Sequence, residues 1–231
     1  METRAVVINE YGGKEKLAEA KVSLPELGAD QVLVKVAATS INPIDWKLRE
    51  GYLKQMFPWS FPIILGWDVA GEIVEVGQKV KDYHVGDRIF ARPETTRFGT
   101  YADYTIVDTN LLAPLPESIA STEAAAVPLA GLTALQALFD HGSLKAGEKV
   151  LIHAGAGGVG TYAIQLAKNA GAYVITTASP RNHELVKKLG ADEVIDYHTT
   201  DFEEVLTDID LVFDTMGGEI QKKSFSVLKE H

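Results

Sequence analysis

The sharpest chemical signal in the sequence is a glycine-rich run, Gly155-Ala156-Gly157-Gly158-Val159-Gly160. The run follows a short apolar segment, 150–154, and opens a segment of helical composition, 159–170. In this strand–turn–helix setting the G-x-G-x-x-G spacing predicts that Gly155 permits a tight turn. It also predicts that Gly157 lets backbone approach a pyrophosphate and that Gly160 lets helix and strand pack closely. The free N–H groups and positive dipole end of the helix would face the phosphates. We therefore expect a dinucleotide site here, the plainer alternative being a glycine-rich turn without a ligand.

The next strand indicates which dinucleotide. It covers residues 173–177 and is followed by Ala178-Ser179-Pro180-Arg181. An NAD site usually places Asp or Glu about 20 residues beyond the glycines, but no acid stands here. Ser179 can hydrogen-bond a 2′-phosphate, and Arg181 can pair with its charge. The sequence favours NADP(H) over NAD, although Ser179 could also cap a helix that begins near Asn182.

The sequence has two parts with different residue patterns. Runs rich in β-branched or aromatic residues at 32–38, 69–77 and 99–107, separated by Gly and Pro, predict a small β barrel or sandwich. Beyond about residue 118, helical segments alternate with short apolar strands, which predicts βαβ units and a parallel sheet. The boundary is expected between residues 115 and 123, which gives domains 1–120 and 121–231. The helices are expected at 122–130, 132–141, 159–170, 182–189, 202–206 and 219–229, and the later strands at 150–154, 173–177, 194–196 and 211–214.

Composition excludes several classes of function. The chain of 231 residues has a net charge of −10, which disfavours nucleic acid and anionic lipid as partners. It contains no cysteine, so thiol nucleophiles and thiolate metal sites are absent. No apolar run reaches the length of a transmembrane helix, and no secretory signal is evident. We expect a cytoplasmic protein.

The order of several motifs resembles the medium-chain dehydrogenase/reductase superfamily along essentially the whole chain. The motifs, apart from the glycine run, are Asn42-Pro43-Ile44-Asp45-Trp46, Gly51-Tyr52, Gly66-Trp67-Asp68-Val69-Ala70-Gly71-Glu72-Ile73, Val76-Gly77, Val85-Gly86-Asp87-Arg88-Ile89-Phe90, Gly131-Leu132-Thr133-Ala134, Lys188-Leu189-Gly190-Ala191-Asp192, Val194-Ile195-Asp196-Tyr197 and Val212-Phe213-Asp214. The resemblance implies an α/β protein: a GroES-like β-rich barrel domain followed by a Rossmann doubly wound parallel sheet.

Zinc alcohol dehydrogenases of this superfamily use Cys and a Gly-His-Glu segment, where this chain has Gly66-Trp67-Asp68 and no cysteine. Zinc sites of these kinds rely on Cys and His ligands. We expect no metal site, and we expect His153, before the glycines, to be structural. The closest resemblance is then to quinone oxidoreductases and related alkenal or enone reductases.

The resemblance also implies roles for individual residues. Asn42, Asp45 and Tyr52 match positions that line the active-site cleft, with the Tyr52 hydroxyl as donor to a developing enolate or hydroquinone oxygen. Packing of the Tyr52 ring and a turn role for Asp45 are the open alternatives. For the cofactor, Thr133 matches the threonine beside the nicotinamide (or a helix cap), and Tyr197 lies near the adenosine phosphate. Asp214 and Met216 match the region where the cofactor ribose passes.

A full doubly wound domain has six strands, of which the sequence predicts four. We therefore expect a C-terminally truncated Rossmann sheet. The family's homodimer forms along the sixth strand, an edge that is missing here.

These observations predict a zinc-independent oxidoreductase that transfers hydride from NADPH to a quinone or an α,β-unsaturated carbonyl. An enoyl reductase of lipid or polyketide type, and a non-catalytic NADPH-binding protein or truncated remnant, are the alternatives.

Overall fold

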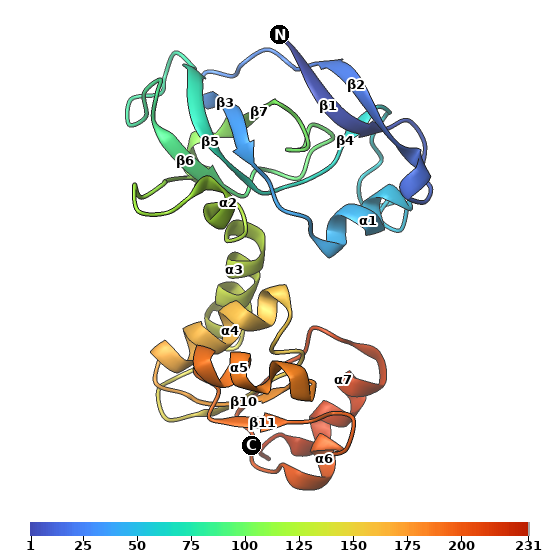
Figure 1. Cartoon of the computed structure of the whole chain (residues 1–231), viewed down its shortest axis with the longest axis vertical. Helices are drawn as coiled ribbons and strands as arrows, with labels where there is room; N and C mark the ends of the chain where they lie inside the picture. Colours follow the sequence, from blue (N-terminus) through green and yellow to red (C-terminus); the bar gives the residue numbers. More distant parts are fainter. Residues whose placement is uncertain (231) are drawn as a thin grey trace. The chain divides into compact units, whose positions relative to one another are not determined.

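The computed structural model describes residues 1–230, which form two compact units divided after Leu129 (Figure 1). Unit 1 is rich in strands, and unit 2 alternates strands and helices. The division falls later in the chain than residue 120 because helix α2 (Ser121–Ala124) packs with unit 1. Its Ala124 is buried in one cluster with Ala70 and Leu115.

Unit 1 contains two antiparallel sheets. The larger has the strand order β7-β3-β5-β6-β8, and the smaller has the order β2-β1-β4. The strands are β1 (Glu2–Ile8), β2 (Leu17–Ser23), β3 (Gln31–Ala38), β4 (Ile63–Ile64), β5 (Val69–Val76), β6 (Arg88–Ala91), β7 (Tyr104–Asp108) and β8 (Leu112–Pro114). Buried valines and isoleucines of the central strands, Val32, Val34, Val69 and Ile73 among them, form the core of the larger sheet. The β-rich N-terminal domain that the sequence predicts is confirmed.

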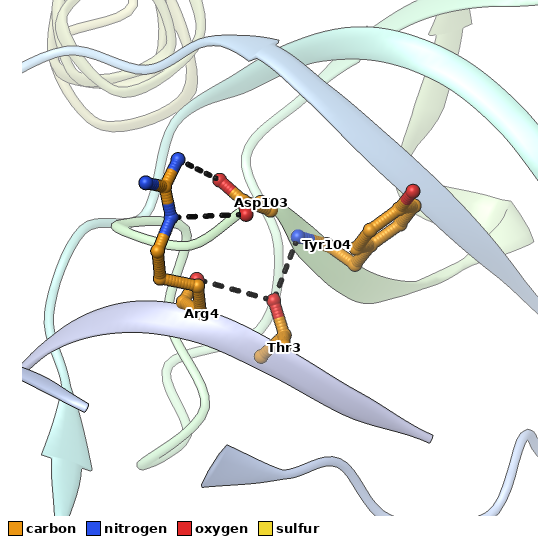
Figure 2. Close-up of polar contacts among 4 residues, drawn as sticks. All are labelled: Thr3, Arg4, Asp103 and Tyr104. Carbon is orange, nitrogen blue, oxygen red and sulfur yellow. Dashed lines mark hydrogen bonds and ion pairs between the residues drawn. The ribbon is translucent and has the colours of Figure 1, made fainter. Parts of the chain in front are cut away.

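The N-terminal strand is tied to the segment before β7 by main-chain and side-chain bonds. Asp103 N donates to Arg4 O at 2.9 Å, and Tyr104 N donates to Thr3 Oγ1 at 3.0 Å. Figure 2 shows that the Arg4 guanidinium donates two hydrogen bonds to the Asp103 carboxylate, of 3.2 and 3.3 Å. Because both of these charged side chains are exposed, the ion pair adds little stability, and the main-chain bonds hold the strand.

Unit 2 is built on a four-stranded parallel sheet of order β11-β10-β9-β12. Its strands are β9 (Lys149–Ile152), β10 (Tyr173–Thr177), β11 (Glu193–Ile195) and β12 (Leu211–Phe213). In chain order this is 3-2-1-4, which matches the first four strands of a Rossmann sheet and confirms the predicted fold. After the last helix, Leu228 makes a single parallel bridge with Ile209, just before β12.

Two apolar layers cover the sheet. Val150 and Ile152 point into a cluster with α4 (Gly158–Asn169), whereas Leu151, between them, packs with Phe202 on the other face. The remaining helices are α3 (Pro128–Leu135), a π-helix (Gln136–His141), α5 (His183–Leu189), α6 (Phe202–Val205) and α7 (Gly218–Ser224). Because the four strands are parallel, their carboxyl ends lie at one edge of the sheet. The last residues of the strands at this edge are Ile152, Thr177, Ile195 and Phe213.

Three sequence predictions differ from the structure in extent. The helix expected at 219–229 ends at Ser224 and continues only as a 3₁₀ turn, Phe225–Val227. The helix expected at 122–130 is interrupted, because α2 stops at Ala124 and Pro128, which lacks an N–H, starts α3. The strand expected at 99–107 begins only at Tyr104. The sequence also did not predict the hairpin of β1 and β2, nor helix α1 (Pro43–Arg49).

Candidate functional site

The glycine run lies at the carboxyl end of β9 and leads into α4. Gly160 has the packing role that the spacing predicts, since an added Cβ would stand 2.3 Å from the carbonyl oxygen of Ala154. Gly155 differs from its predicted role: an added Cβ would stand 2.0 Å from Thr176 Oγ1, so this glycine permits packing against β10. The left-handed residue of the turn is Ala154, with φ of 54°.

The amino end of α4 is open toward solvent. Gly157 precedes the helix, and Gly157 and Gly158 are both exposed. Helix geometry leaves the first N–H groups, of Gly158, Val159 and Gly160, without partners within the helix. An added Cβ at Gly158 would meet nothing within 4 Å, so backbone is accessible there. A pyrophosphate fits these residues, because the donors, the positive dipole end and the open backbone coincide.

The segment after β10, from Ala178 to Arg181, is called the 2′-phosphate corner. It carries the side chains that the sequence predicts to bind a 2′-phosphate. Arg181 is exposed, and the segment from Ala178 to Arg181 contains no acid. Ser179 Oγ accepts a bond of 3.3 Å from Asn182 Nδ2, which leaves its own O–H free to donate. Its side chain makes no capping bond to the following 3₁₀ turn, so the helix-cap alternative is not what the structure shows.

Two other predicted cofactor residues lie at the same edge of the sheet. Tyr197 follows β11, is exposed, and its ring lies 4.3 Å from that of His198. Asp214 follows β12, and its carboxylate accepts N–H bonds from Met216 at 2.7 Å and Gly217 at 3.1 Å. Asp214 therefore shapes its own loop, and that loop exposes Met216.

Thr133, the remaining predicted cofactor residue, lies inside α3 and is exposed. A helix-start cap, the alternative reading of this threonine, is excluded by that position.

In unit 1, Asn42 and Asp45 belong to the start of α1. The N–H of Asn42 donates to Asp45 Oδ2 at 2.6 Å, and the Tyr101 hydroxyl donates to the same oxygen at 2.7 Å. Asp45 Oδ1 is buried without a partner among residues 1–230. Burial raises the pKa of the Asp45 carboxyl above its ordinary value, with a further contribution from Asp68, while the two hydrogen bonds oppose the rise. Burial and the bond to Asp45 also raise the pKa of Tyr101, which therefore keeps its proton.

A second carboxylate, Asp68, organises the segment before α1. It is fully buried, and its Oδ2 accepts from the Ser40 hydroxyl and, at 2.7 Å, from Asn42 Nδ2. Its Oδ1 accepts from the N–H of Leu129 at 2.7 Å, and its carbonyl oxygen accepts from Thr39. Asp68 was noted in the sequence only as the residue in place of a glutamate, and its contact with Asn42 spans 26 positions.

These hydrogen bonds determine which atom of the Asn42 amide is free to bind a ligand. A carboxylate only accepts hydrogen bonds, so the amide nitrogen of Asn42 must be the atom that faces Asp68. The same nitrogen lies 3.2 Å from Ser40 Oγ, so both amide hydrogens are directed to partners within the protein. Asn42 can therefore offer a ligand its carbonyl oxygen, an acceptor, and not the donor that a developing oxyanion needs.

Tyr52 is the remaining predicted donor. It lies in the turn after α1, with 70% of its surface exposed. Its ring contacts Trp46 edge to face at 5.8 Å. Within the described chain its hydroxyl has no hydrogen-bond partner, so it remains available to a ligand.

The position of the family's zinc-binding histidine is occupied by Trp67, whose side chain is fully buried. Among residues 1–230 no three His, Cys, Asp or Glu side chains are grouped to hold a metal ion. An indole is not a zinc ligand, so Trp67 cannot take the place of that histidine in a zinc site.

Comparisons with known proteins identify the family of the chain. Residues 28–117 match the model of the alcohol dehydrogenase GroES-like domain, and residues 158–231 match that of the zinc-binding dehydrogenases. A chloroplast envelope quinone oxidoreductase homolog of Arabidopsis thaliana is 44% identical over 84% of this chain and 61% of its own length. An NADPH-dependent alkenal/one oxidoreductase of the same plant is 40% identical over 99% of this chain and 61% of its own length.

Among solved structures, the quinone oxidoreductase from Coxiella burnetii superposes with a TM-score of 0.92 at 40% identity. The match covers 99% of this chain and 73% of that one. A GroES-like domain followed by a Rossmann sheet is the combination that defines the medium-chain dehydrogenases/reductases. Within that class, the chain belongs to the quinone oxidoreductase branch.

The chain spans about 61% of the length of these two plant relatives. No helix within residues 1–230 is long and apolar enough to cross a membrane.

Proposed function

We propose that unit 2 binds NADP(H) at the carboxyl edge of its sheet. The single observation that carries this proposal is the combination of an open amino end of α4 with an acid-free corner that holds Ser179 and Arg181. The α4 donors would receive the pyrophosphate, and Arg181 with Ser179 would receive the 2′-phosphate. Tyr197, Met216 and Thr133 are proposed as further cofactor contacts. The name of the Arabidopsis alkenal/one oxidoreductase, which includes NADPH dependence, supports this choice.

We infer that the activity is reduction of a quinone or an α,β-unsaturated carbonyl. Bound NADPH would supply the hydride. The protein would supply the Tyr52 hydroxyl as donor to the substrate oxygen, where negative charge develops. Such substrates are already electrophilic, so they need no metal as Lewis acid, in keeping with Trp67 at the position of the zinc ligand. Asn42, held by Asp68, would accept a hydrogen bond from a ligand N–H or O–H, and Asp45 would position Asn42 and Tyr101.

The test is NADPH oxidation by the purified chain, followed by absorbance at the nicotinamide band. We expect oxidation with 1,4-benzoquinone or 2-cyclohexenone that a metal chelator leaves unchanged. Ethanol with NADP⁺ serves as the control substrate and should give no reaction. Loss of activity with the chelator would contradict the metal-free mechanism. NADPH binding without oxidation of either acceptor would favour a non-catalytic NADPH-binding protein.

We also propose a cytoplasmic location and, as the resemblance implies for the family, a homodimer, whose sixth edge strand is not among residues 1–230. The absence of cysteine supports a reducing compartment, whereas the plant quinone oxidoreductase homolog belongs to the chloroplast envelope. Cell fractionation tests the first proposal, and light scattering of the purified chain tests whether it dimerises without that strand.

A further inference from the structure

In unit 2, three buried side chains are joined by hydrogen bonds next to the turn from Ala154 to Gly160, which we call the glycine cradle. His153, Thr177 and Ser224 are 2%, 6% and 6% exposed, and they come from the ends of β9, β10 and α7. His153 Nε2 lies 3.1 Å from Ser224 Oγ, and His153 Nδ1 lies 3.4 Å from Thr177 Oγ1. Thr177 Oγ1 in turn accepts the N–H of Ala154 at 3.1 Å.

The hydrogen-bond partners of Ser224 determine which atom donates in each bond that links Ser224, His153 and Thr177. The Ser224 hydroxyl donates to the carbonyl oxygen of Ile220 at 2.7 Å, so toward His153 it can only accept. The hydrogen of the neutral imidazole is therefore on Nε2, and Nδ1 is an acceptor for the Thr177 hydroxyl. Burial lowers the pKa of His153, which favours this neutral form.

Thr177 holds the two residues that begin the cradle. Its hydroxyl receives the N–H of Ala154, and its carbonyl oxygen receives the N–H of Gly155 at 3.1 Å. Ala154 adopts the left-handed conformation that non-glycine residues rarely take, so its position needs this support. The carbonyl oxygen of Ala154 then accepts the N–H of Gly157 at 2.9 Å and lies against Gly160.

We propose that His153 is a positioning residue for the dinucleotide. Through Thr177 it orients the turn from Ala154 to Gly157 that receives the pyrophosphate, and through Ser224 it ties this turn to α7. This role rests on the proposed NADP(H) site and goes beyond it, because no atom of His153 needs to touch the cofactor. A purely space-filling role, suggested by the ring of Phe202 at 4.7 Å, would leave pyrophosphate binding independent of the Thr177 hydroxyl.

The test compares two ligands by titration calorimetry. NADPH needs both the cradle and the 2′-phosphate corner, whereas adenosine 2′-monophosphate has no pyrophosphate and needs only the corner. The variants are Thr177→Val, which removes the hydroxyl at nearly constant shape, Thr177→Ser, which keeps it, and His153→Phe, which keeps an aromatic ring. Thr105→Val removes a buried hydroxyl in unit 1 and is the matched control.

We expect Thr177→Val and His153→Phe each to weaken NADPH binding about tenfold, the loss of roughly one buried hydrogen bond. The double variant should be little worse than either, because both remove the same connection. Binding of adenosine 2′-monophosphate should be unchanged in all variants, and Thr177→Ser and Thr105→Val should bind NADPH as the wild type does.

Unchanged NADPH binding by Thr177→Val or by His153→Phe would overturn the proposal, as would an equal loss of both ligands or a similar loss in Thr105→Val. A wild-type chain that binds neither ligand would instead overturn the proposed function, and this role with it.

Discussion

Substitution of Gly160 tests the packing of the cradle most sharply. An alanine Cβ here would lie 2.3 Å from the Ala154 oxygen and 2.7 Å from Gly155 Cα, both of them backbone atoms. Ordinary contact begins at 3.4 Å, so α4 and the turn must separate by about 1 Å. Overpacking of this kind costs about 1–3 kcal/mol, and the upper end applies because backbone cannot swing aside as a side chain does. We expect Gly160→Ala to destabilise unit 2 by about 3 kcal/mol.

Gly158→Ala is the matched substitution two residues earlier. Gly158 is the first residue of α4, and an added Cβ would meet nothing within 4 Å. Because alanine restricts the unfolded chain and fits the helix, we expect a gain of roughly 0.5 kcal/mol in stability. The two substitutions are chemically identical and lie in one turn of helix, so opposite signs can come only from their surroundings.

The assay can separate the two units. All three tryptophans, Trp46, Trp59 and Trp67, lie in unit 1, so their fluorescence in urea follows unit 1 alone. Circular dichroism at 222 nm follows the helices, which lie mainly in unit 2. The Gly160→Ala transition should move to lower urea in the circular dichroism signal and stay in place in the fluorescence signal. Equal stabilities of Gly160→Ala and Gly158→Ala would refute the reasoning.

Further predictions concern the donor and the titrating groups. Tyr52→Phe should lower kcat for quinone or enone reduction roughly 10- to 100-fold and leave the Kd for NADPH unchanged, since the hydroxyl acts on the substrate oxygen; an unchanged kcat would remove Tyr52 from the mechanism. The raised pKa of Asp45 means that the folded state binds a proton more tightly than the unfolded state, so unit 1 should lose stability as pH rises from 3.8 through the raised value. Asp45→Asn should abolish that slope in tryptophan fluorescence melts. The lowered pKa of His153 has the opposite sign: unit 2 should lose stability as pH falls below 6.5, and His153→Phe should remove this loss from melts followed by circular dichroism.

The sequence predicted the elements whose pattern is local. Val150 to Ile152 is an uninterrupted apolar run, and it forms most of β9, one of the two central strands of the unit 2 sheet. The hairpin of β1 and β2 was missed because β2 buries only Val22 and so shows little apolar alternation, although β1 does alternate exposed Glu2 and Arg4 with buried Thr3 and Ala5. Helix α1 was missed because it is short and begins at a proline, which can equally start a turn.

In the candidate site, too, the sequence predicted only the features that depend on residues close together in the chain. The glycine spacing, in its strand–turn–helix setting, predicted the packing role of Gly160, because that role depends on contacts within one turn. The bond from Asn42 to Asp68 depends on how the segment after β3 meets the segment before β5, which no local pattern encodes. The proposal that Asn42 acts as an acceptor therefore required the structure. Likewise, Gly155 was assigned the turn that Ala154 makes, because the support from Thr177 comes from the next strand.

The most direct test of the central claim is a titration of the purified chain with NADPH beside NADH, in the wild type and in Arg181→Gln. We expect the wild type to bind NADPH more tightly than NADH. Arg181→Gln should bind NADPH about tenfold more weakly and NADH unchanged, because the proposed partner of this side chain is the 2′-phosphate. Equal binding of the two nucleotides by the wild type, or an equal loss of both in the variant, would contradict the account.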